Sequence, residues 1–343
     1  MASTTARIGI IGASGYTGAE LLRIVAQHPS LDVAFATGDS QAGNAAAELY
    51  PGLALAYPDL IFQRWDPALL DGVDGVFLGL PHGASQAIVG DVLGKVGAVV
   101  DLGADFRLGD AATYERWYHE PHTAPELLDR FVYGLPELHR DALKGAEAVA
   151  APGCYPTAAT LALRPLVDAG LVETTGIIVD AVSGVSGAGR PPKPSSTFCA
   201  VDENVEAYGL LDHRHTSEMD MNLGATVLFT PHLVPMNRGI LATCYARPAV
   251  DGLSTEAVLD VLMQRYRDEP FVVAAERSPS TKATLGTNAA HVTARYDERT
   301  ATVLAIAAID NLGKGASGQA VQCMNLALGL PEAQGLAVVG TAP

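Results

Sequence analysis

Cys154 lies in a segment whose residue types suit a nucleophilic thiol. Residues 148–151, Ala-Val-Ala-Ala, predict a short buried strand, and residues 157–167 predict an Ala/Leu-rich helix with Pro156 in its first turn, where a missing N–H costs nothing. At such a strand-to-helix turn the positive end of the helix dipole favours a thiolate, and the first N–H groups could hold an oxyanion. Most single cysteines are inert buried thiols, and the local pattern by itself leaves both interpretations open.

A second group that could work with this thiol is the segment 212–218, Asp-His-Arg-His-Thr-Ser-Glu. His215 and Glu218 are three residues apart, so in a helix they share a face and the carboxylate could orient the imidazole. His213 would then point away, whereas in an irregular segment both histidines could reach the thiol. The alternative is a solvated polar helix face. A metal site is not indicated, because the His-x-His pair has no evident third ligand.

Two arginines follow predicted strand ends in settings that suit an anionic substrate. Arg107 stands in Asp105-Phe-Arg-Leu, and Arg190 closes the glycine-rich segment 183–190. Guanidinium groups bind carboxylate or phosphate well. Either arginine taken alone could be an ordinary surface residue.

The elements that must position these residues begin with a dinucleotide-binding pattern. Residues 8–11 form a compact apolar run, a glycine turn covers 12–18, and residues 19–25 have helical spacing. Thr17 and Glu20 are spaced as a capping box. The order of strand, glycine turn and helix matches the phosphate-cradling part of a Rossmann unit. The spacing is G-x-x-G-x-x-G, and the competing interpretation is an ordinary tight turn.

Further strands at 33–37, 75–80 and 98–102 are densely apolar, as expected for a parallel sheet covered on both faces. The loop at residues 38–41 follows the first of these strands, and the adenine ribose of a dinucleotide would bind there. Asp39 could accept a hydrogen bond from a 2′-hydroxyl, whereas Ser40 and nearby N–H groups could hold a 2′-phosphate. The residues therefore leave NAD versus NADP open.

From about residue 154 the pattern changes to an α+β domain. It has predicted strands at 177–182, 239–246, 291–295 and 302–309 in a mixed or antiparallel sheet, and a helix over 255–267. A glycine-rich turn then leads into a final helix at about 319–328. We expect a dinucleotide-binding domain over 1–153, a catalytic and oligomerisation domain over 154–312, and a C-terminal helix within 313–343 that returns to the first domain.

Composition narrows the function classes. The 343 residues carry a net charge of −16, a sequence pI near 4.8 and 48% apolar residues. Nucleic acid and anionic membranes need a basic surface, so neither is an expected partner. The N-terminus lacks an apolar signal core, and we expect a cytoplasmic protein. The four cysteines, at 154, 199, 244 and 323, form no CxxC pair, which disfavours a disulfide framework or a zinc site.

Several segments together resemble the N-acetyl-γ-glutamyl-phosphate reductases of arginine biosynthesis. In order they are GASGYTGAELLRI, DLGADFRL, APGCYPTAA, SGVSGAGR, HRHTSE, PHLVPMNRGI and NLGKGASGQAVQ. The resemblance spans nearly the whole chain and implies a fold similar to that of aspartate-semialdehyde dehydrogenase and glyceraldehyde-phosphate dehydrogenase. It implies NADP(H), a small anionic acyl-phosphate substrate, phosphate, and a homo-tetramer or homo-dimer. The family often has an arginine where this chain has residues 38–40.

The resemblance also assigns roles. Cys154 would be the nucleophile that forms a thioester, and a histidine of the HRH segment would return a proton. The spacing to Glu218, and not the resemblance, ranks His215 before His213. Arg107 and Arg190, with Lys193 as an addition, would hold the substrate's anionic groups. The cofactor would meet the loop residues Gly12, Ser14, Gly15, Tyr16 and Thr17 at its diphosphate, Ser40 at its ribose and Gly313 near its nicotinamide.

Three other functions stay open. A related enzyme of lysine synthesis reduces an aminoadipyl phosphate on an acidic carrier protein, which the charge of −16 disfavours. Aspartate-semialdehyde dehydrogenase is distinguished by the HRHTSE segment. A non-catalytic NADP(H)-binding protein would show cofactor binding without phosphate-dependent turnover.

Overall fold

The computed structural model describes residues 5–341, and the chain divides into two units. The first contains residues 5–152 and 316–336, and the second contains residues 153–315 and 337–341. Residues 1–4, part of the N-terminus in which we expected no signal core, lie outside the described residues.

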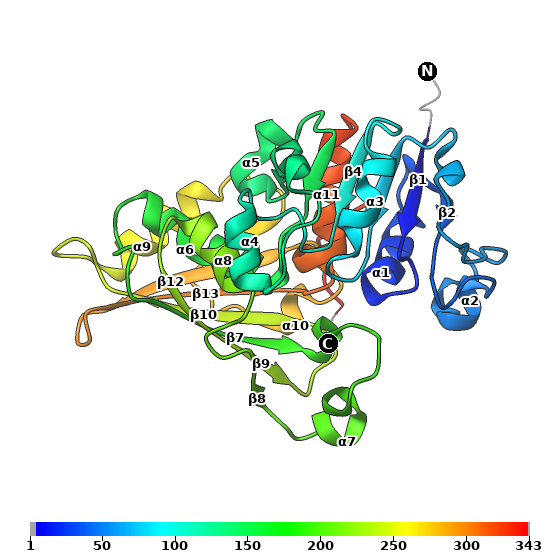
Figure 1. The fold of residues 1–343 in the computed structure, drawn as a ribbon. Coiled ribbons are helices and arrows are strands. Elements are labelled where there is room, and N and C mark those ends of the chain that lie inside the picture. Colours follow the sequence, from blue (N-terminus) through cyan, green and yellow to red (C-terminus); the bar gives the residue numbers. More distant parts are fainter. Residues whose placement is uncertain (1–4, 342–343) are drawn as a thin grey trace. The chain divides into compact units, whose positions relative to one another are not determined.

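The first unit is built on a six-stranded sheet in the order β2-β1-β3-β4-β6-β5, with every pairing parallel (Figure 1). Its strands are β1 (Ala6–Ile11), β2 (Leu31–Ala36), β3 (Gly75–Leu78), β4 (Ala98–Asp101), β5 (Phe131–Tyr133) and β6 (Ala148–Ala150). Successive side chains alternate between faces: Phe77 joins one buried cluster, and Val76 and Leu78 join another. Both faces are therefore covered, as the apolar strands predicted.

Helices cover this sheet on its two faces. They are α1 (Tyr16–Val25), α2 (Ala46–Leu49), α3 (Ala84–Val92), α4 (Ala111–Tyr118), α5 (Pro136–Leu143) and α11 (Gly318–Ala327). Leu21 of α1 and Met324 of α11 belong to the cluster that holds Phe77, whereas Val89 of α3 belongs to the opposite one. Helix α11 is thus part of the first unit, although the sequence of the second unit precedes it (Figure 1).

The expected capping box at the start of α1 is wrong. The N-cap residue is Gly15, so Thr17 lies inside the first turn, and no side chain caps the helix. Glu20 instead forms an ion pair with Arg23, 2.7 Å away. The turn places the helix start two residues earlier than the side-chain pattern indicated.

The second unit is built on a seven-stranded mixed sheet in the order β11-β12-β13-β10-β7-β9-β8. Its strands are β7 (Ile177–Gly184), β8 (Glu206–Ala207), β9 (Val227–Val234), β10 (Ile240–Ala246), β11 (Val272–Ala274), β12 (Ala290–Asp297) and β13 (Thr302–Ile309). Its α-helices are α6 (Cys154–Asp168), α7 (Phe198–Val201), α8 (His215–Leu223), α9 (Thr255–Arg265) and α10 (Thr281–Thr284). The predicted combination of a Rossmann-type parallel sheet with a mixed, largely antiparallel sheet is confirmed.

Helix α6 is the buried helix of this unit and packs against α8, α9 and the strands β10, β12 and β13. Pro165 lies inside it and cannot donate a hydrogen bond to the carbonyl of Leu161. The hydroxyl of Tyr266 donates to that carbonyl at 2.7 Å. The helix therefore continues through the proline, and Cys154 is held at the N-terminus of a well-packed helix.

Within residues 5–341, the helices are all too short or too polar to cross a membrane.

Candidate active site at the start of helix α6

Cys154 is the first residue of α6, three positions earlier than the apolar pattern predicted. Gly153 is the N-cap, with extended φ and ψ of −66° and 149°. Thr157 closes the first turn by donating to the carbonyl of Gly153 through both its N–H and its hydroxyl, each at 3.0 Å. Pro156 occupies this turn as expected. Cys154 is partly exposed. Because it begins the helix, its thiol lies at the end of the helix dipole that stabilises negative charge.

The imidazole of His215 lies directly against Gly153. A Cβ atom built on Gly153 would be 2.5 Å from Nε2 of His215, closer than any real contact. A side chain at this position would therefore displace the imidazole. His215 is itself the first residue of α8, so two helix starts bring the thiol-bearing turn and the imidazole together.

Glu218 lies in the first turn of α8 and is almost fully buried. Its Oε1 accepts a hydrogen bond of 2.7 Å from the N–H of Gly153. The spacing predicted Glu218 as the group that orients His215, which stays a prediction, and the structure shows a contact that the spacing did not indicate. It fixes the backbone immediately before Cys154.

His213 lies beside His215 but in a different environment. Its ring is surrounded by Tyr155, Tyr208 and Phe229, with ring centroids 5.2–6.0 Å away. Burial, with a smaller effect of the adjacent Arg214 charge, lowers the pKa of His213 to about 4. Nδ1 of His213 lies 3.2 Å from the N–H of His215 and accepts from it. In the neutral ring the proton is therefore on Nε2, and the ring of His213 accepts from the first N–H of α8.

A glycine-rich segment of the second unit, residues 313–315, also lies close to Cys154. A Cβ atom built on Gly315 would be 2.9 Å from Cβ of Cys154. Gly313 was predicted to approach the nicotinamide, and a Cβ there would be 2.0 Å from the carbonyl oxygen of Thr287. The backbone of Thr287 leaves no room for a side chain at 313, and Gly315 is the residue that lies against the nucleophile.

The other three cysteines have different surroundings. Cys244 and Cys323 are fully buried, and burial raises the pKa of the Cys244 thiol. Cys199 is exposed in α7. Among the four, Cys154 alone begins a long buried helix beside an imidazole.

Arg107 is buried in the first unit. Its Nε donates to the carbonyl of Ala151 at 2.8 Å, and a terminal nitrogen donates to the carbonyl of Leu102 at 3.0 Å. Only 9% of the residue is exposed. Arg107 lies on the loop that follows β4, as its place after a predicted strand indicated, and two backbone carbonyls anchor its guanidinium and connect this loop to Ala151. Its role as an anion ligand stays a prediction.

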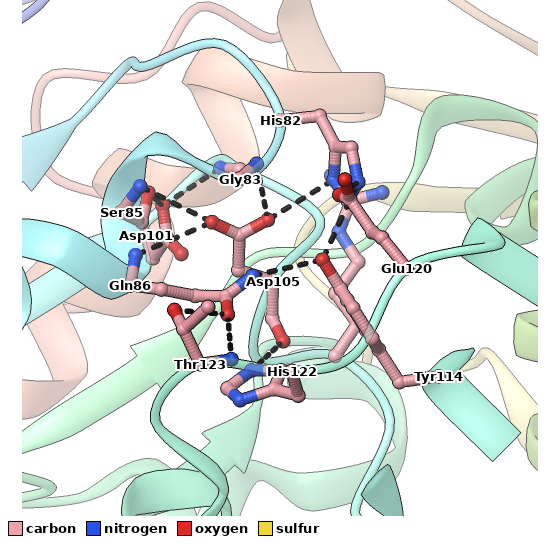
Figure 2. A network of polar contacts seen from close by, with 12 residues as sticks. His82, Gly83, Ser85, Gln86, Asp101, Asp105, Tyr114, Glu120, His122 and Thr123 are labelled. Carbon is pink, nitrogen blue, oxygen red and sulfur yellow. Dashed lines mark hydrogen bonds and ion pairs between the residues drawn. The ribbon is translucent and has the colours of Figure 1, made fainter. Parts of the chain in front are cut away.

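The loop that carries Arg107 is fixed by the polar network of Figure 2. The carboxylate of Asp105 accepts from the N–H groups of Gly83 and Ser85 at the start of α3 and lies 3.0 Å from Nδ1 of His82. Burial opposes ionisation of Asp105, but these contacts hold its pKa below the ordinary value. The neighbouring Asp101 is fully buried, and burial, reinforced by the charge of Asp105, raises its pKa to about 7.

Arg190 and Lys193 follow the short helix Val185–Ala188 in the second unit. Arg190 is half-buried, and its Nε has no hydrogen-bond partner among residues 5–341. Lys193 is exposed at the start of the turn Pro194–Ser196. Both are placed on a loop, as predicted.

The three glycines of the predicted cofactor turn have separate reasons to be glycine. Gly12 has a positive φ of 86°, and a Cβ there would be 2.4 Å from the carbonyl oxygen of Gly79. A Cβ on Gly18 would be 2.4 Å from Cα of Ala13. Gly15 is different, because its nearest neighbour would be 3.7 Å away, an ordinary contact. Space is therefore kept open at the N-terminus of α1, where a diphosphate would bind.

The remaining residues of the cofactor prediction lie around this turn. Ser14, Tyr16 and Thr17 flank Gly15, and the carbonyl of Ser14 accepts from the hydroxyl of Tyr50 at 2.8 Å. Ser40 is exposed in the loop after β2, beside Gly38, where a Cβ would lie 3.0 Å from that of Ser14. The loop after β2 and the glycine turn are thus neighbours within the first unit.

Sequence reasoning missed Gly153 and Gly315 as site residues. Gly153 directly precedes Cys154, and Gly315 lies in the glycine-rich turn before the last helix. Their importance depends on which side chains pack against them. The alternating glycines at 313 and 315 were the signal in the sequence that could have identified Gly315 as a site residue. This pattern did not indicate which residue each glycine faces.

Two family models match the chain. Residues 7–146 match the semialdehyde dehydrogenase NAD binding domain, and residues 154–311 match the semialdehyde dehydrogenase dimerisation domain.

Full-length relatives are also similar. Proteins named N-acetyl-gamma-glutamyl-phosphate reductase from Symbiobacterium thermophilum and Desulforudis audaxviator are 49% and 48% identical, each over 98% of this chain and 99% of the relative. One from Ectopseudomonas mendocina is 46% identical over the same shares.

Among solved structures, aspartate semialdehyde dehydrogenase II from Vibrio cholerae aligns with a TM-score of 0.68 at 16% identity, over 95% of this chain and 99% of that one. Aspartate semialdehyde dehydrogenase with NADP from Candida albicans aligns with a TM-score of 0.70 at 15% identity, over 94% and 98%. At these identities the likeness shows the fold.

Proposed function

We propose that this chain, which belongs to the N-acetyl-γ-glutamyl-phosphate reductase family, reduces N-acetyl-γ-glutamyl phosphate to N-acetylglutamate semialdehyde and phosphate with NADPH. The observation that carries the proposal is the close approach of His215 to the residue before Cys154, in a chain nearly half identical to such reductases. A carboxylate accepts hydride poorly, and an acyl phosphate that becomes a thioester removes this difficulty.

In the proposed reaction Cys154 is the nucleophile. His215 accepts the thiol proton, the sulfur attacks the acyl carbon, and phosphate leaves from a tetrahedral intermediate whose oxyanion lies near the first N–H groups of α6. Bound NADPH supplies the hydride that the thioester requires. Hydride addition leaves the thiohemiacetal as an oxyanion. Its C=O bond re-forms as the C–S bond breaks, and His215 returns its proton to the departing sulfur of Cys154.

The two histidines take different roles in this proposal. A proton donor for this step works best with a pKa near the operating pH. The low pKa of His213 keeps it neutral near pH 7, so it is poorly suited to donate a proton. His215 is therefore the proposed acid–base group. His213 and Glu218 are proposed to position it and the turn before Cys154.

Arg190 and Lys193 are proposed to bind the substrate's phosphate and carboxylate groups. Arg190 is favoured, because the described contacts leave its Nε without an acceptor. Arg107 is kept as a weaker candidate, since two of its donors already bind backbone carbonyls.

For the cofactor, we propose that Gly12, Ser14, Gly15, Tyr16 and Thr17 hold the diphosphate of NADP(H). Support comes from the open space at Gly15, which the protein's own packing does not fill. Ser40 would face the adenine ribose, and Gly313 would act through the backbone of its loop.

We further propose a cytoplasmic homo-oligomer, a dimer or a tetramer. Leu228, Ile178 and Tyr245 are direct cross-strand neighbours on β9, β7 and β10 and are 37–47% exposed. This apolar row lies in the segment that matches the dimerisation domain. A second copy packed on this face would bury it.

The deciding experiment is a phosphate-dependent oxidation assay. N-acetylglutamate semialdehyde, NADP⁺ and phosphate should give rapid turnover, and aspartate semialdehyde should be a poor substrate. Preference for aspartate semialdehyde would make this an aspartate-semialdehyde dehydrogenase. Binding of NADP(H) without turnover of either aldehyde would favour the non-catalytic alternative.

A further inference from the structure

Asp310 is a buried carboxylate that none of the proposed chemical steps uses. It follows β13 directly, and it is completely buried. Nε of Arg238 lies 3.0–3.1 Å from its two oxygens. Its carboxylate also accepts from three backbone N–H groups, those of Gly286 at 2.6 Å, Leu312 at 2.9 Å and Gly313 at 3.1 Å. A buried charge with this many donors is well compensated and is geometrically fixed.

The next residue, Asn311, also forms hydrogen bonds that fix this segment. Oδ1 of Asn311 accepts from the N–H of Gly239 at 2.8 Å, and its Nδ2 donates to the hydroxyl of Ser186 at 2.9 Å. Both partners lie next to strands of the same sheet: Gly239 precedes β10, which pairs with β13, and Ser186 follows β7, which pairs with β10. Two consecutive side chains therefore fix the start of the segment 311–315.

This segment ends against the nucleophile. The N–H of Gly315 donates to the carbonyl of Asp310 at 2.9 Å, and a Cβ on Gly315 would be 2.9 Å from Cβ of Cys154. A Cβ on Gly313 would overlap the carbonyl oxygen of Thr287, so the segment has little freedom to shift. The location of the backbone beside the thiol is thus set by contacts centred on Asp310.

We propose that Asp310 and Arg238 are positioning residues that hold the backbone of Gly315 against Cys154 and thereby control the reaction of the thiol. This inference rests on the proposed nucleophilic role of Cys154. It predicts that weakening the pair changes thiol chemistry and kcat, while cofactor affinity and substrate KM change little. Misplacement by about 1 Å at a reacting group can lower a rate by about 10²-fold.

The test compares Arg238→Met, which removes the charge, with Arg238→Lys, which keeps it. Iodoacetamide alkylation of Cys154 is followed by mass spectrometry, alongside kcat, KM and the NADPH dissociation constant. We expect Arg238→Met to change the alkylation rate at least 5-fold and to lower kcat about 10–100-fold, with KM and the dissociation constant within 3-fold. Arg238→Lys should recover part of both effects.

Arg265→Met is the matched control, because it removes an Arg–Glu pair of the same unit, 3.2 Å long, at the end of α9. It should alkylate and turn over like the parent. If Arg238→Met does the same, or differs only in its melting temperature, the pair is structural and the proposal is overturned.

Gly315→Ala covers the case in which Arg238→Met does not fold. Its methyl group would press on Cys154 without touching the carboxylate, so it should also alter alkylation at least 5-fold. Parent-like alkylation in this variant would overturn the proposal. Alkylation of Cys154 does not use the acyl phosphate. If the proposed substrate is wrong, turnover is absent but the alkylation rates still differ between the parent and the variants. If the positioning role is wrong, the alkylation rates are the same.

Discussion

Nε2 of His215 occupies the space in which a side chain on Gly153 would begin, 2.5 Å from the position of its Cβ. The contact joins the imidazole to the backbone of the residue that precedes Cys154. Glu218, one turn further along α8, accepts from the N–H of the same glycine. Two residues of the HRHTSE segment thus hold one peptide unit, and the nucleophile follows it directly.

Gly153→Ala should displace His215 while leaving the cofactor turn intact. The added methyl group must move the ring, because 2.5 Å is too short for any carbon–nitrogen contact. We expect kcat to fall about 10²-fold, since proton transfer depends on position. Stopped-flow kinetics should show the loss, and NADPH titration should remain parent-like. Full activity would mean that His215 acts from another position or not at all.

The two histidines should differ when each is changed to asparagine. His215→Asn should lower kcat about 10²–10⁴-fold and alter the pH–rate profile. His213→Asn should lower it less, because an asparagine oxygen can still accept from the N–H of residue 215. If His213→Asn proves to be the inactive variant, the assigned roles are reversed.

His213 should also make the folded protein sensitive to acid. Its pKa is 6.5 in the unfolded chain and about 4 in the folded protein, so between these values only the unfolded chain binds the proton. Stability is therefore lost as the pH falls from 6.5 to 4, by up to about 3 kcal/mol. Urea unfolding of the parent and of His213→Asn across this range should show a smaller loss in the variant. Equal losses would contradict the buried, neutral state.

Gly15→Val and Gly18→Val should separate cofactor binding from folding. Gly15 has room for a side chain within the protein, so its variant should fold normally and lose affinity for NADPH sharply. Gly18 packs on the backbone of Ala13, so its variant should melt at a lower temperature. Fluorescence titration and thermal melts test both statements. Unchanged NADPH affinity in folded Gly15→Val would place the diphosphate elsewhere.

Asp101→Asn should become relatively more stable than the parent as the pH rises. The pKa of Asp101 is 3.8 when unfolded and about 7 when folded, so between these values the folded protein retains a proton that the unfolded chain loses. The free energy of unfolding therefore falls with increasing pH in the parent, and the variant should avoid a loss on the order of 2 kcal/mol between pH 5 and pH 8. The exposed Asp91→Asn serves as the control. Parallel pH curves for Asp101→Asn and the parent would show that Asp101 is ionised throughout this range.

The sequence by itself determined the order of the secondary-structure elements and the residues whose side chains could take part in catalysis. Periodic apolar runs, the glycine turn and the strand-to-helix pattern at Cys154 depend on neighbours within a few residues, so they are readable without a structure. These signals predicted both sheets, the nucleophile candidate and the HRH segment. They misplaced the start of α1, because Thr17 and Glu20 have capping-box spacing but the backbone at Gly15 sets the helix end.

Only the tertiary structure decided how those residues are used. The difference between His213 and His215 comes from Tyr208 and Phe229, which lie beside the ring of His213, and from the burial that lowers the pKa of that ring. The place of Arg107 after a strand made it a candidate anion ligand, and only the structure shows that its guanidinium donates to two backbone carbonyls. The need for glycine at 153 and 315 arises from groups 62 and 161 residues away in sequence, His215 and Cys154. Burial and long-range contact are properties of packing, and a local sequence pattern does not contain them.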